Sequence, residues 1–482
     1  MTKPKIDKLV FVLIFFVLSL GIFIRAYNIN YDDFWFDEIL SFWVADPKIS
    51  TLESWERHKS IEQIPFLYNL ILKTLFKIFG YEVFIGRYLS LIFNILGIFF
   101  IVKTTRLLKN NNSYIFALFL LSSNIYLISY SQELRPYSLI LFLCALVIYY
   151  FFKTIKSTQE KKFNLNLLFI NLVTQILMIC SHPFTLIIYF SIILFIVIKY
   201  YKFNKSFKEL NLSIFISLIF CFFYLYFYIN NLSTYPGWLE QPGLKFYTNF
   251  YFSTFFGSRI VGLFYLVTLL FLVFSFKKVF LKEVKNLTFF LILLILCYFL
   301  PLTFGYLIKP IIFHRYIIFV LIPIVVLISI LIFEIKNQKI RIITIVLLIL
   351  LTLGNHYTES TVLQFIKERP HYKPEFNRLL NKIDKSEVKY YTFNLDISSE
   401  TKASAFYALT NYIMALGKIE DYKLIYFEID QFINSEEKKI WTICLPIITK
   451  DKCKNLNPKF NSRIIFSENF SAINLKLIEK NN

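Results

Sequence analysis

Long apolar runs separated by short polar loops make up the chain from about residue 9 to residue 356. A helix needs ~20 apolar residues to cross the hydrocarbon core of a bilayer, and the runs have about that length. None of them alternates with period two, as the strands of a membrane barrel do. The pattern therefore predicts a polytopic α-helical membrane protein with about 11 transmembrane helices. Their approximate positions are 9–28, 82–102, 113–130, 136–152, 164–181, 183–200, 211–230, 259–276, 287–306, 314–334 and 341–356.

The polar segment that follows His356 has a different pattern. Short β-rich runs at 389–395, 424–427 and 441–448 alternate with helix-like stretches such as 403–416. Strands that alternate with helices indicate a small α/β domain. We therefore expect two domains, a transmembrane domain over residues 1–356 and a small C-terminal α/β domain over residues 357–482.

Two of the loops between apolar runs are long enough to have structure of their own. In the first, at about residues 28–81, the stretch from Ile64 to Phe79 is apolar but carries Lys73 and Lys77 on one edge, so we expect a helix that lies in the membrane interface. The second, at about residues 230–258, contains Tyr235-Pro236-Gly237-Trp238 and Gln241-Pro242-Gly243. Pro-Gly pairs favour turns, and we expect this loop to lie on the membrane as a lid.

Composition and charge define the surroundings and the topology. The chain is 57% hydrophobic and 20% aromatic, and its net charge of +20 comes from lysines in short loops, which argues against a nucleic-acid partner. These basic loops alternate with loops that carry few cations, which predicts a cytoplasmic N-terminus. With an odd number of spans, the C-terminal domain is expected on the outer side of the cytoplasmic (inner) membrane.

Six cysteines divide into two groups. Cys144, Cys180, Cys221 and Cys297 lie inside apolar runs, where we interpret them as small core residues. Cys444 and Cys453 lie in the polar tail on the expected outer side and are a candidate disulfide pair, although the sequence does not establish the bond.

An acidic pair, Asp37-Glu38, follows the first apolar run directly. It comes after the aromatic residues Phe34, Trp35 and Phe36, which are typical of the headgroup level of a membrane. The pair fits two interpretations, a solvated rim of the loop or carboxylates that are held next to lipid-borne chemistry.

Few other side chains on the predicted outer side are able to do chemistry. They are Arg87, Glu133, Arg135, His182, His314 and Arg315. Arg87 also fits a residue that only anchors its helix, and His182, which precedes Pro183, also fits a helix cap. Glu133 and Arg135 also fit an ion pair of a surface turn. Taken together, acids, imidazoles and arginines beside lipid suit a reaction on an anionic lipid-linked substrate, with arginine on a phosphate and a carboxylate as base.

Several of these positions fall in motifs that resemble those of the family 39 glycosyltransferases of the GT-C superfamily, which include protein O-mannosyltransferases and aminoarabinose transferases. The matching stretches are Asp37-Glu38, Gln63-Ile64-Pro65-Phe66-Leu67-Tyr68, Phe79-Gly80-Tyr81-Glu82, Gly86-Arg87-Tyr88-Leu89-Ser90, Tyr130-Ser131-Gln132-Glu133-Leu134-Arg135-Pro136-Tyr137 and Arg315-Tyr316. Their order and spacing cover most of residues 9–335. At Ile64-Pro65 the chain departs from the family, which often has two prolines there.

The resemblance implies a GT-C transmembrane catalytic domain that transfers a sugar from a polyprenyl-phosphate donor on the outer face, with inversion. Asp37 is then the base, and Arg135 and Arg315, with Arg87 behind them, bind the donor phosphate. Glu38 or Glu133 orients the base or holds a divalent metal; some GT-C enzymes use a metal and others do not, so the cofactor stays open. His182, His314 and Tyr137 are expected to support the site.

Two other classes compete with this interpretation. A lipid or glycan transporter, such as a flippase, should show paired halves with broken helices, which the sequence lacks. An O-antigen ligase or polymerase also uses polyprenyl-linked sugars but usually has its main outer loop late in the chain, whereas here the long acidic loop comes first. The sequence identifies neither the sugar nor the acceptor, whether lipid, glycan or protein.

Overall fold

The computed structural model describes most of the chain. The described residues are 8–62, 64–109, 111–159, 165–200, 212–222, 239–276, 286–358, 373–395, 399–417, 423–445, 462–471 and 473–481. They form two compact units, which are described separately. The helical unit comprises Met1–Tyr27, Gln63–Tyr68 and Tyr88–Arg369, and the mixed unit comprises Asn28–Glu62, Asn69–Arg87 and Pro370–Asn482.

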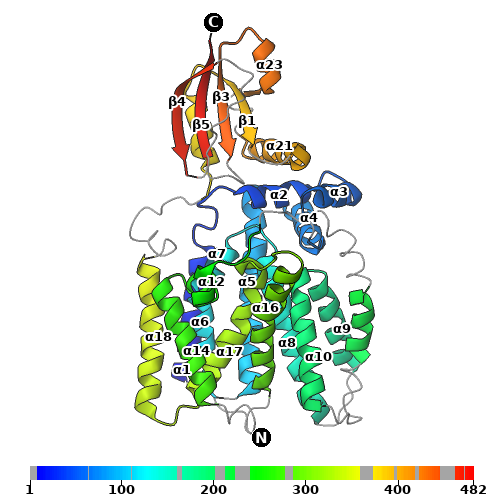
Figure 1. Ribbon diagram of the computed structural model, residues 1–482, viewed down its shortest axis with the longest axis vertical. Helices are drawn as coiled ribbons and strands as arrows, with labels where there is room; N and C mark the ends of the chain where they lie inside the picture. Colours follow the sequence, from blue (N-terminus) through cyan, green and yellow to red (C-terminus); the bar gives the residue numbers. More distant parts are fainter. Residues whose placement is uncertain are drawn as a thin grey trace. The chain divides into compact units, whose positions relative to one another are not determined.

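Long apolar helices make up the helical unit (Figure 1). They are α1 (Lys8–Ala26), α5 (Val83–Leu108, from Tyr88 onward), α6 (Ser113–Ser122), α7 (Ile125–Ser131), α8 (Tyr137–Gln159), α9 (Leu165–Ile179), α10 (Leu186–Tyr200), α14 (Arg259–Ser275), α16 (Leu287–Leu307), α17 (Leu321–Ile332) and α18 (Gln338–Thr358). Each lies on a segment that the sequence predicts to span. Within the described residues, 5 helices are long and apolar enough to cross a membrane, or up to 6 if the bent pair α6–α7 is one span. The chain is thus a multi-pass helical membrane protein, and the larger number of spans stays a prediction.

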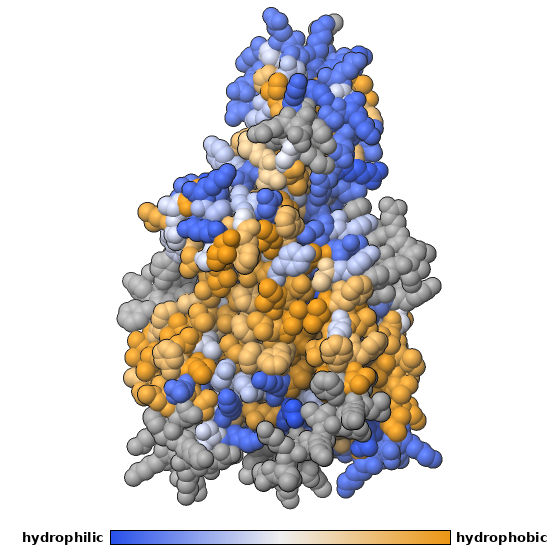
Figure 2. Space-filling view, turned by 180° about the vertical axis from the view of Figure 1, so that it is seen from behind, coloured by the Kyte–Doolittle hydropathy of each residue, from blue (hydrophilic) through white to orange (hydrophobic). Residues whose placement is uncertain are grey.

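Burial differs between the helices in the way that a lipid-embedded bundle requires. All residues of α17 from Leu321 to Ile332 are buried, because this helix is apolar on every side and is surrounded by protein. On α1, α14 and α16 large apolar side chains point outward; Phe15, for example, is 65% exposed. Figure 2 shows the hydrophobic side chains that cover the middle of this unit, a surface that suits contact with lipid.

A break between α6 and α7 bends this pair by 57°. The Asn124 side chain accepts a hydrogen bond from the Leu127 N–H and so caps α7. Arg25 of α1 donates to the carbonyls of Leu121 and Ser122 at 2.9 and 2.7 Å, which satisfies the last carbonyls of α6. The broken helix is therefore held by side chains that replace the missing backbone bonds.

The mixed unit combines short helices with one sheet (Figure 1). Its helices are α2 (Phe36–Val44), α3 (Thr51–Ile61), α4 (Leu67–Phe79, from Asn69 onward), α20 (Phe376–Asp384), α21 (Ser399–Ala415) and α23 (Ile429–Asn434). Its strands are β1 (Tyr390–Leu395), β2 (Ile425–Tyr426), β3 (Lys439–Leu445), β4 (Ser462–Phe470) and β5 (Ile473–Lys480). The sheet order is β2-β1-β3-β5-β4. Strand β1 is parallel to β2 and β3, and strand β5 is antiparallel to β3 and β4.

The predictions for the C-terminal segment and the long loops can now be compared with the structure. A sheet is present at the C-terminus as expected, and its antiparallel β4–β5 pair was not foreseen. The compact units also divide the chain differently from the expected domains, because most of the first long loop packs with the C-terminal segment. Cys444 is the second-last residue of β3 and is disulfide-bonded. Cys453 lies outside the described residues. The Tyr235–Trp238 turn of the expected lid lies outside them too.

Candidate active site

The acidic pair lies in the first turn of α2 in the mixed unit. Trp35 is the N-cap residue, so Asp37 and Glu38 occupy the second and third positions of the helix. The backbone N–H of Trp35 donates to Glu38 Oε2 at 3.3 Å, which provides an acceptor for one N–H at the start of the helix. Carboxylates in a first turn also interact favourably with the positive end of the helix dipole. Local sequence therefore explains why both acids begin this helix.

Glu38 is fully buried and bound by two cations. Arg87 donates from Nε to Oε1 at 2.9 Å and from Nη2 to Oε2 at 3.0 Å, and Lys373 donates from Nζ to Oε2 at 2.8 Å. Burial by itself raises the pKa of Glu38, but the charges and hydrogen bonds of Arg87 and Lys373 outweigh it and lower the pKa to about 2. Glu38 is therefore ionised at neutral pH and is a poor proton acceptor.

The remaining donors of Arg87 bind backbone carbonyls of the loop before α2. Nη1 donates to Ile29 at 3.0 Å and Asp32 at 2.7 Å, and Nη2 donates to Asp33 at 3.2 Å. A guanidinium has five N–H donors, and these bonds with the two to Glu38 engage all of them. These contacts show that Arg87 holds the loop and Glu38; the donor-phosphate role expected for Arg87 stays a prediction.

Asp37 differs from its neighbour in exposure. Its side chain is half-buried, whereas Glu38 is 0% exposed. The Ser41 hydroxyl donates to the Asp37 main-chain oxygen at 3.1 Å, so the backbone of this turn is tied within the helix. Of the two carboxylates, Asp37 is thus the less buried.

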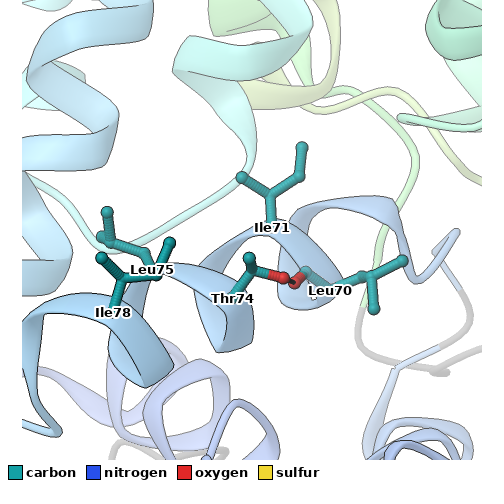
Figure 3. Close-up of a pocket in the computed structure, with 5 residues that line it drawn as sticks. All are labelled: Leu70, Ile71, Thr74, Leu75 and Ile78. Atoms are coloured by element: carbon teal, nitrogen blue, oxygen red, sulfur yellow. Dashed lines mark hydrogen bonds between the residues drawn. The ribbon is translucent and has the colours of Figure 1, made fainter.

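Helix α4 of the mixed unit has one apolar face open to its surroundings. Leu70, Ile71, Thr74, Leu75 and Ile78 line a shallow hollow of about 370 Å³ on this face (Figure 3). The expected basic edge needs one correction, because Lys73 is buried and its ammonium donates to the carbonyls of Asp46 and Ile49. Lys77 alone remains exposed. The interfacial position of α4 stays a prediction.

A second group of predicted residues lies in the helical unit around the ring of Tyr137. The guanidinium carbon of Arg135 lies 5.9 Å from the ring centroid and that of Arg315 lies 5.7 Å from it. Arg135 is 5% and Arg315 is 9% exposed, so both charges are largely desolvated. The fold thus brings together two arginines that are 180 residues apart in the chain, and aromatic rings support both cations.

His182 lies against the same group. Its Nδ1 accepts a hydrogen bond from the Phe184 N–H at 3.2 Å, which confirms the helix-cap interpretation. A neutral imidazole that accepts at Nδ1 carries its proton on Nε2, and this buried Nε2 has no hydrogen-bond partner among the residues that the structure describes. Burial, followed by the charges of Arg135 and Arg315, lowers the pKa of His182 to about 3. His182 therefore presents a neutral N–H donor beside two cations.

The other two supporting residues join this group through tyrosines. His314 Nδ1 and the Tyr126 hydroxyl are 3.0 Å apart, and the Tyr126 ring packs on Tyr130 with centroids 4.6 Å apart. Tyr130 in turn packs on Tyr137 at 5.2 Å. Glu133 is half-buried, and its charge and that of Arg315 both act on Tyr130. The tyrosines therefore form one side of the group.

Hydrogen bonds fix the turn that carries Arg135. Gln132 Nε2 donates to the Arg25 carbonyl at 3.0 Å, and the Ser138 hydroxyl donates to the Tyr130 carbonyl at 2.9 Å. The Ser90 hydroxyl donates to the Arg135 carbonyl at 3.4 Å. With the turn tied to two other helices, the Arg135 side chain starts from a fixed backbone. Preorganised cations of this kind suit the binding of a phosphate.

The structure thus divides the predicted residues between the two units. Asp37, Glu38 and Arg87 lie in the mixed unit, and Arg135, Arg315, His182, His314, Glu133 and Tyr137 lie in the helical unit. Sequence reasoning missed Lys373. It included Tyr130 and Tyr316 in the matching stretches but gave them no role in the site; the Tyr316 ring packs on His182 with centroids 5.2 Å apart. Lys373 gave no signal because it lies 335 residues from Glu38. Within the described residues, no group of three or more His, Cys, Asp or Glu is placed to hold a metal ion.

Comparison with known proteins now adds the family context. Residues 63–227 match the sequence model of the family described as dolichyl-phosphate-mannose-protein mannosyltransferase. No curated protein matches the chain. The family match covers the middle of the chain and includes Arg87, Arg135 and His182.

Solved structures match over a much longer part. ArnT from Cupriavidus metallidurans in the apo state matches with a TM-score of 0.62 and 10% identity over 97% of each chain. The same protein bound to undecaprenyl phosphate matches with a TM-score of 0.56 and 8% identity over 97% of each chain. The Archaeoglobus fulgidus oligosaccharyltransferase in complex with Zn and sulfate matches with a TM-score of 0.51 and 10% identity, over 89% of this chain and 67% of that one.

The chain therefore shares the fold of ArnT over nearly all of its length. The resemblance to glycosyltransferases that the sequence motifs indicate is confirmed by the family model over residues 63–227, and the shared fold agrees with it.

Proposed function

We propose that this protein is a membrane glycosyltransferase that moves a sugar from a polyprenyl-phosphate donor to an acceptor on the outer face of the cytoplasmic membrane. The observation that carries the proposal is the buried group of Arg135, Arg315 and His182 around Tyr137. The fold it shares with ArnT, one structure of which holds undecaprenyl phosphate, supports the same donor class. The acceptor is a lipid, a glycan or a protein.

The first part of the mechanism is recognition of the donor phosphate. Arg135 and Arg315 each offer a planar pair of N–H donors, which matches two phosphate oxygens better than an ammonium does. His182 adds the N–H of its neutral imidazole, which can donate a hydrogen bond to the phosphate without the ring becoming protonated. Because these groups are buried, their attraction for an anion is stronger than at a water-exposed surface. The polyprenyl chain remains in the bilayer beside the apolar helices.

The second part is the transfer step, in which Asp37 acts as general base. The acceptor hydroxyl loses its proton to the Asp37 carboxylate as its oxygen attacks the anomeric carbon of the sugar. The bond from that carbon to the phosphate oxygen breaks, and polyprenyl phosphate leaves with the electron pair. Attack from the face opposite the phosphate inverts the anomeric centre. The leaving phosphate already carries negative charge, so cations stabilise its departure and a proton donor is not required.

The roles of the other residues follow from their contacts. Glu38 and Arg87 position the turn that carries Asp37, through the ion pair between them and the loop carbonyls that Arg87 binds. Tyr137 supports both phosphate arginines with its ring. His314 and Glu133 support the tyrosines next to that ring. A divalent metal remains compatible with Glu133 but is not used in this scheme.

The experiment that tests the proposal uses the purified full chain in lipid nanodiscs with a panel of polyprenyl-phosphate sugars. Its acceptors are a membrane extract of the host envelope, and mass spectrometry identifies the glycosylated product. Sugar transfer that depends on Asp37 supports the proposal. Polymer extension points to the O-antigen ligase or polymerase class. Movement of unaltered donor across the bilayer, without transfer, points to a transporter and overturns the proposal.

A further inference from the structure

The loop that leads into α2 is bound at three points by the C-terminal segment of the mixed unit. The bound residues are Asp33 and Phe34 of the loop and Glu38 in the first turn of α2, and they bracket the candidate base Asp37. The binding residues are Asn377 of α20, Tyr412 of α21 and Lys373, which precedes α20. All six lie in the same compact unit.

The first point is a helix cap supplied from a distant part of the chain. Asn377 is the second residue of α20, and its backbone N–H donates to Asp33 Oδ2 at 2.8 Å, while its side-chain amide donates to Asp33 Oδ1. The residue at the N-cap position of α20, Glu375, makes no side-chain cap bond. Orphan N–H groups at a helix start need an acceptor. Asp33 provides it from 344 residues away, which couples the start of α20 to the acidic loop.

The second point fixes the residue after Asp33. The Phe34 N–H donates to the Tyr412 hydroxyl at 2.9 Å, and the two rings stack with centroids 5.2 Å apart. Both side chains are 0% exposed. The guanidinium of Arg87 lies 4.9 Å from the Phe34 ring on which Tyr412 also packs. Backbone and ring of Phe34 are thus both held.

The third point is the ion pair of Lys373 with Glu38. The ammonium lies 2.8 Å from Oε2, and the Lys373 side chain is 17% exposed while that of Glu38 is 0% exposed. Glu38 therefore balances a cation from the start of α5 and a cation from the C-terminal segment. Glu38 directly follows Asp37 in the chain. Asp37 therefore lies between two residues, Phe34 and Glu38, that are both held by the C-terminal segment.

We propose that Lys373, Asn377 and Tyr412 are positioning residues for the transfer step, so that the C-terminal segment forms part of the catalytic machinery. They hold the first turn of α2 and thereby orient the Asp37 carboxylate toward the acceptor hydroxyl. This inference rests on the proposed function, in which Asp37 is the base. A small displacement of a reacting group is costly, since about 1 Å of misplacement lowers a rate by roughly 100-fold.

The test compares Lys373→Met, Asn377→Leu and Tyr412→Phe in the full-length protein. Lys373→Met removes the ion pair with Glu38, Asn377→Leu removes the side-chain bond to Asp33, and Tyr412→Phe removes the hydroxyl that accepts from the Phe34 N–H. All three leave Asp37 and the arginine group unaltered. Lys382→Met is the matched control, because Lys382 lies on α20 and forms a more exposed pair with Glu468 in the same unit. Lys373→Arg tests for rescue, since a guanidinium keeps the charge next to Glu38.

For Lys373→Met we expect kcat to fall by about 10- to 100-fold with the donor KM unchanged. Lys373→Arg should recover most of the turnover, and Lys382→Met should behave like the wild type. In a double mutant with Asp37→Asn, the loss should not exceed that of Asp37→Asn alone, because both changes act on one step. A further loss in the double mutant, or normal kcat in all three variants, overturns the inference.

A second measurement separates this inference from the proposed function. Hydrogen exchange of the peptides that cover residues 28–44 reports the order of the loop without any substrate. We expect faster exchange there in Lys373→Met and Tyr412→Phe than in Lys382→Met. Unchanged exchange overturns the inference even if sugar transfer is found. Absence of sugar transfer in the wild-type protein overturns the proposed function, and the exchange result then stands as a structural property of the loop.

Discussion

Glu38 and Arg87 form a two-pronged ion pair in which both side chains are buried. Nε meets Oε1 at 2.9 Å and Nη2 meets Oε2 at 3.0 Å. A pair of this kind costs desolvation on both sides and is retained only with good geometry and further hydrogen bonds. Here Lys373 and three loop carbonyls supply those bonds. The pair therefore organises the turn that carries Asp37.

The pair gives the protein a defined acid sensitivity. The pKa of Glu38 in the folded protein, about 2, is below its unfolded value, so its contribution to stability is present at neutral pH. That contribution, roughly 3 kcal/mol, is lost as the pH falls from ~4.5 toward ~2. Thermal unfolding of the purified protein between pH 7 and pH 3 measures the first part of this loss. Glu38→Gln should be less stable at pH 7 and should lack this part of the pH dependence; equal pH profiles would contradict the assignment.

Replacement of Asp37 by Asn tests the base. The amide keeps the shape of the carboxylate but accepts no proton, so turnover should fall by ~10²–10⁴-fold while donor binding survives. Glu38→Gln should lower turnover less, because its amide oxygen still accepts a hydrogen bond from Arg87. The measurement is sugar transfer at matched protein levels beside donor binding. If Glu38→Gln abolished transfer and Asp37→Asn did not, the base would be Glu38.

Conservative changes of the two phosphate arginines test the anion site. Arg135→Lys and Arg315→Lys keep the charge but lose the planar pair of donors, so the affinity for undecaprenyl phosphate should fall by about 10-fold for each. Arg259→Lys is the matched control, since Arg259 is an exposed arginine in the same unit. Binding measured in nanodiscs decides the point. Affinities like that of the control in both variants would show that these arginines are structural only.

His182 gives a prediction that separates its two roles. His182→Asn retains an oxygen that caps the turn at Phe184 but loses the N–H at the position of Nε2, so folding should survive and undecaprenyl phosphate should bind roughly 5- to 10-fold more weakly. The pKa of His182 is about 3, because burial and the charges of Arg135 and Arg315 lower it. The ratio of wild-type to variant affinity should therefore stay constant from pH 5 to pH 8. A ratio that rises on acidification would show a histidine that gains its proton in this range.

The membrane orientation is testable by fusion. We expect the N-terminus in the cytoplasm and the C-terminal segment outside, because basic loops alternate with loops poor in cations. A reporter that is active only outside the cytoplasm, fused after Asn482, should be active. An inactive fusion together with an active cytoplasmic reporter at the same position would reverse both the orientation and the proposed location of the site.

The sequence by itself determined the helices of the membrane part. Length and hydrophobicity of each apolar run are local properties, and a bilayer leaves the backbone of such a run few alternatives to a helix. It also singled out Asp37 and Glu38, because two acids after an aromatic cluster stand out in an apolar chain. The motifs around Arg135 indicated the resemblance that the family model over residues 63–227 then bore out.

The partners of these residues were decided only by the tertiary structure. The sequence allowed Arg87 to bind a phosphate, and the fold surrounds it with Glu38 and three carbonyls. It likewise placed Lys73 on an exposed edge, where the fold buries it against two carbonyls. Lys373 reaches Glu38 across 335 residues of chain. The acceptors around a buried cation come from segments that are distant in the sequence. Which of them lie close together depends on how these segments pack, and a local sequence pattern does not encode this packing.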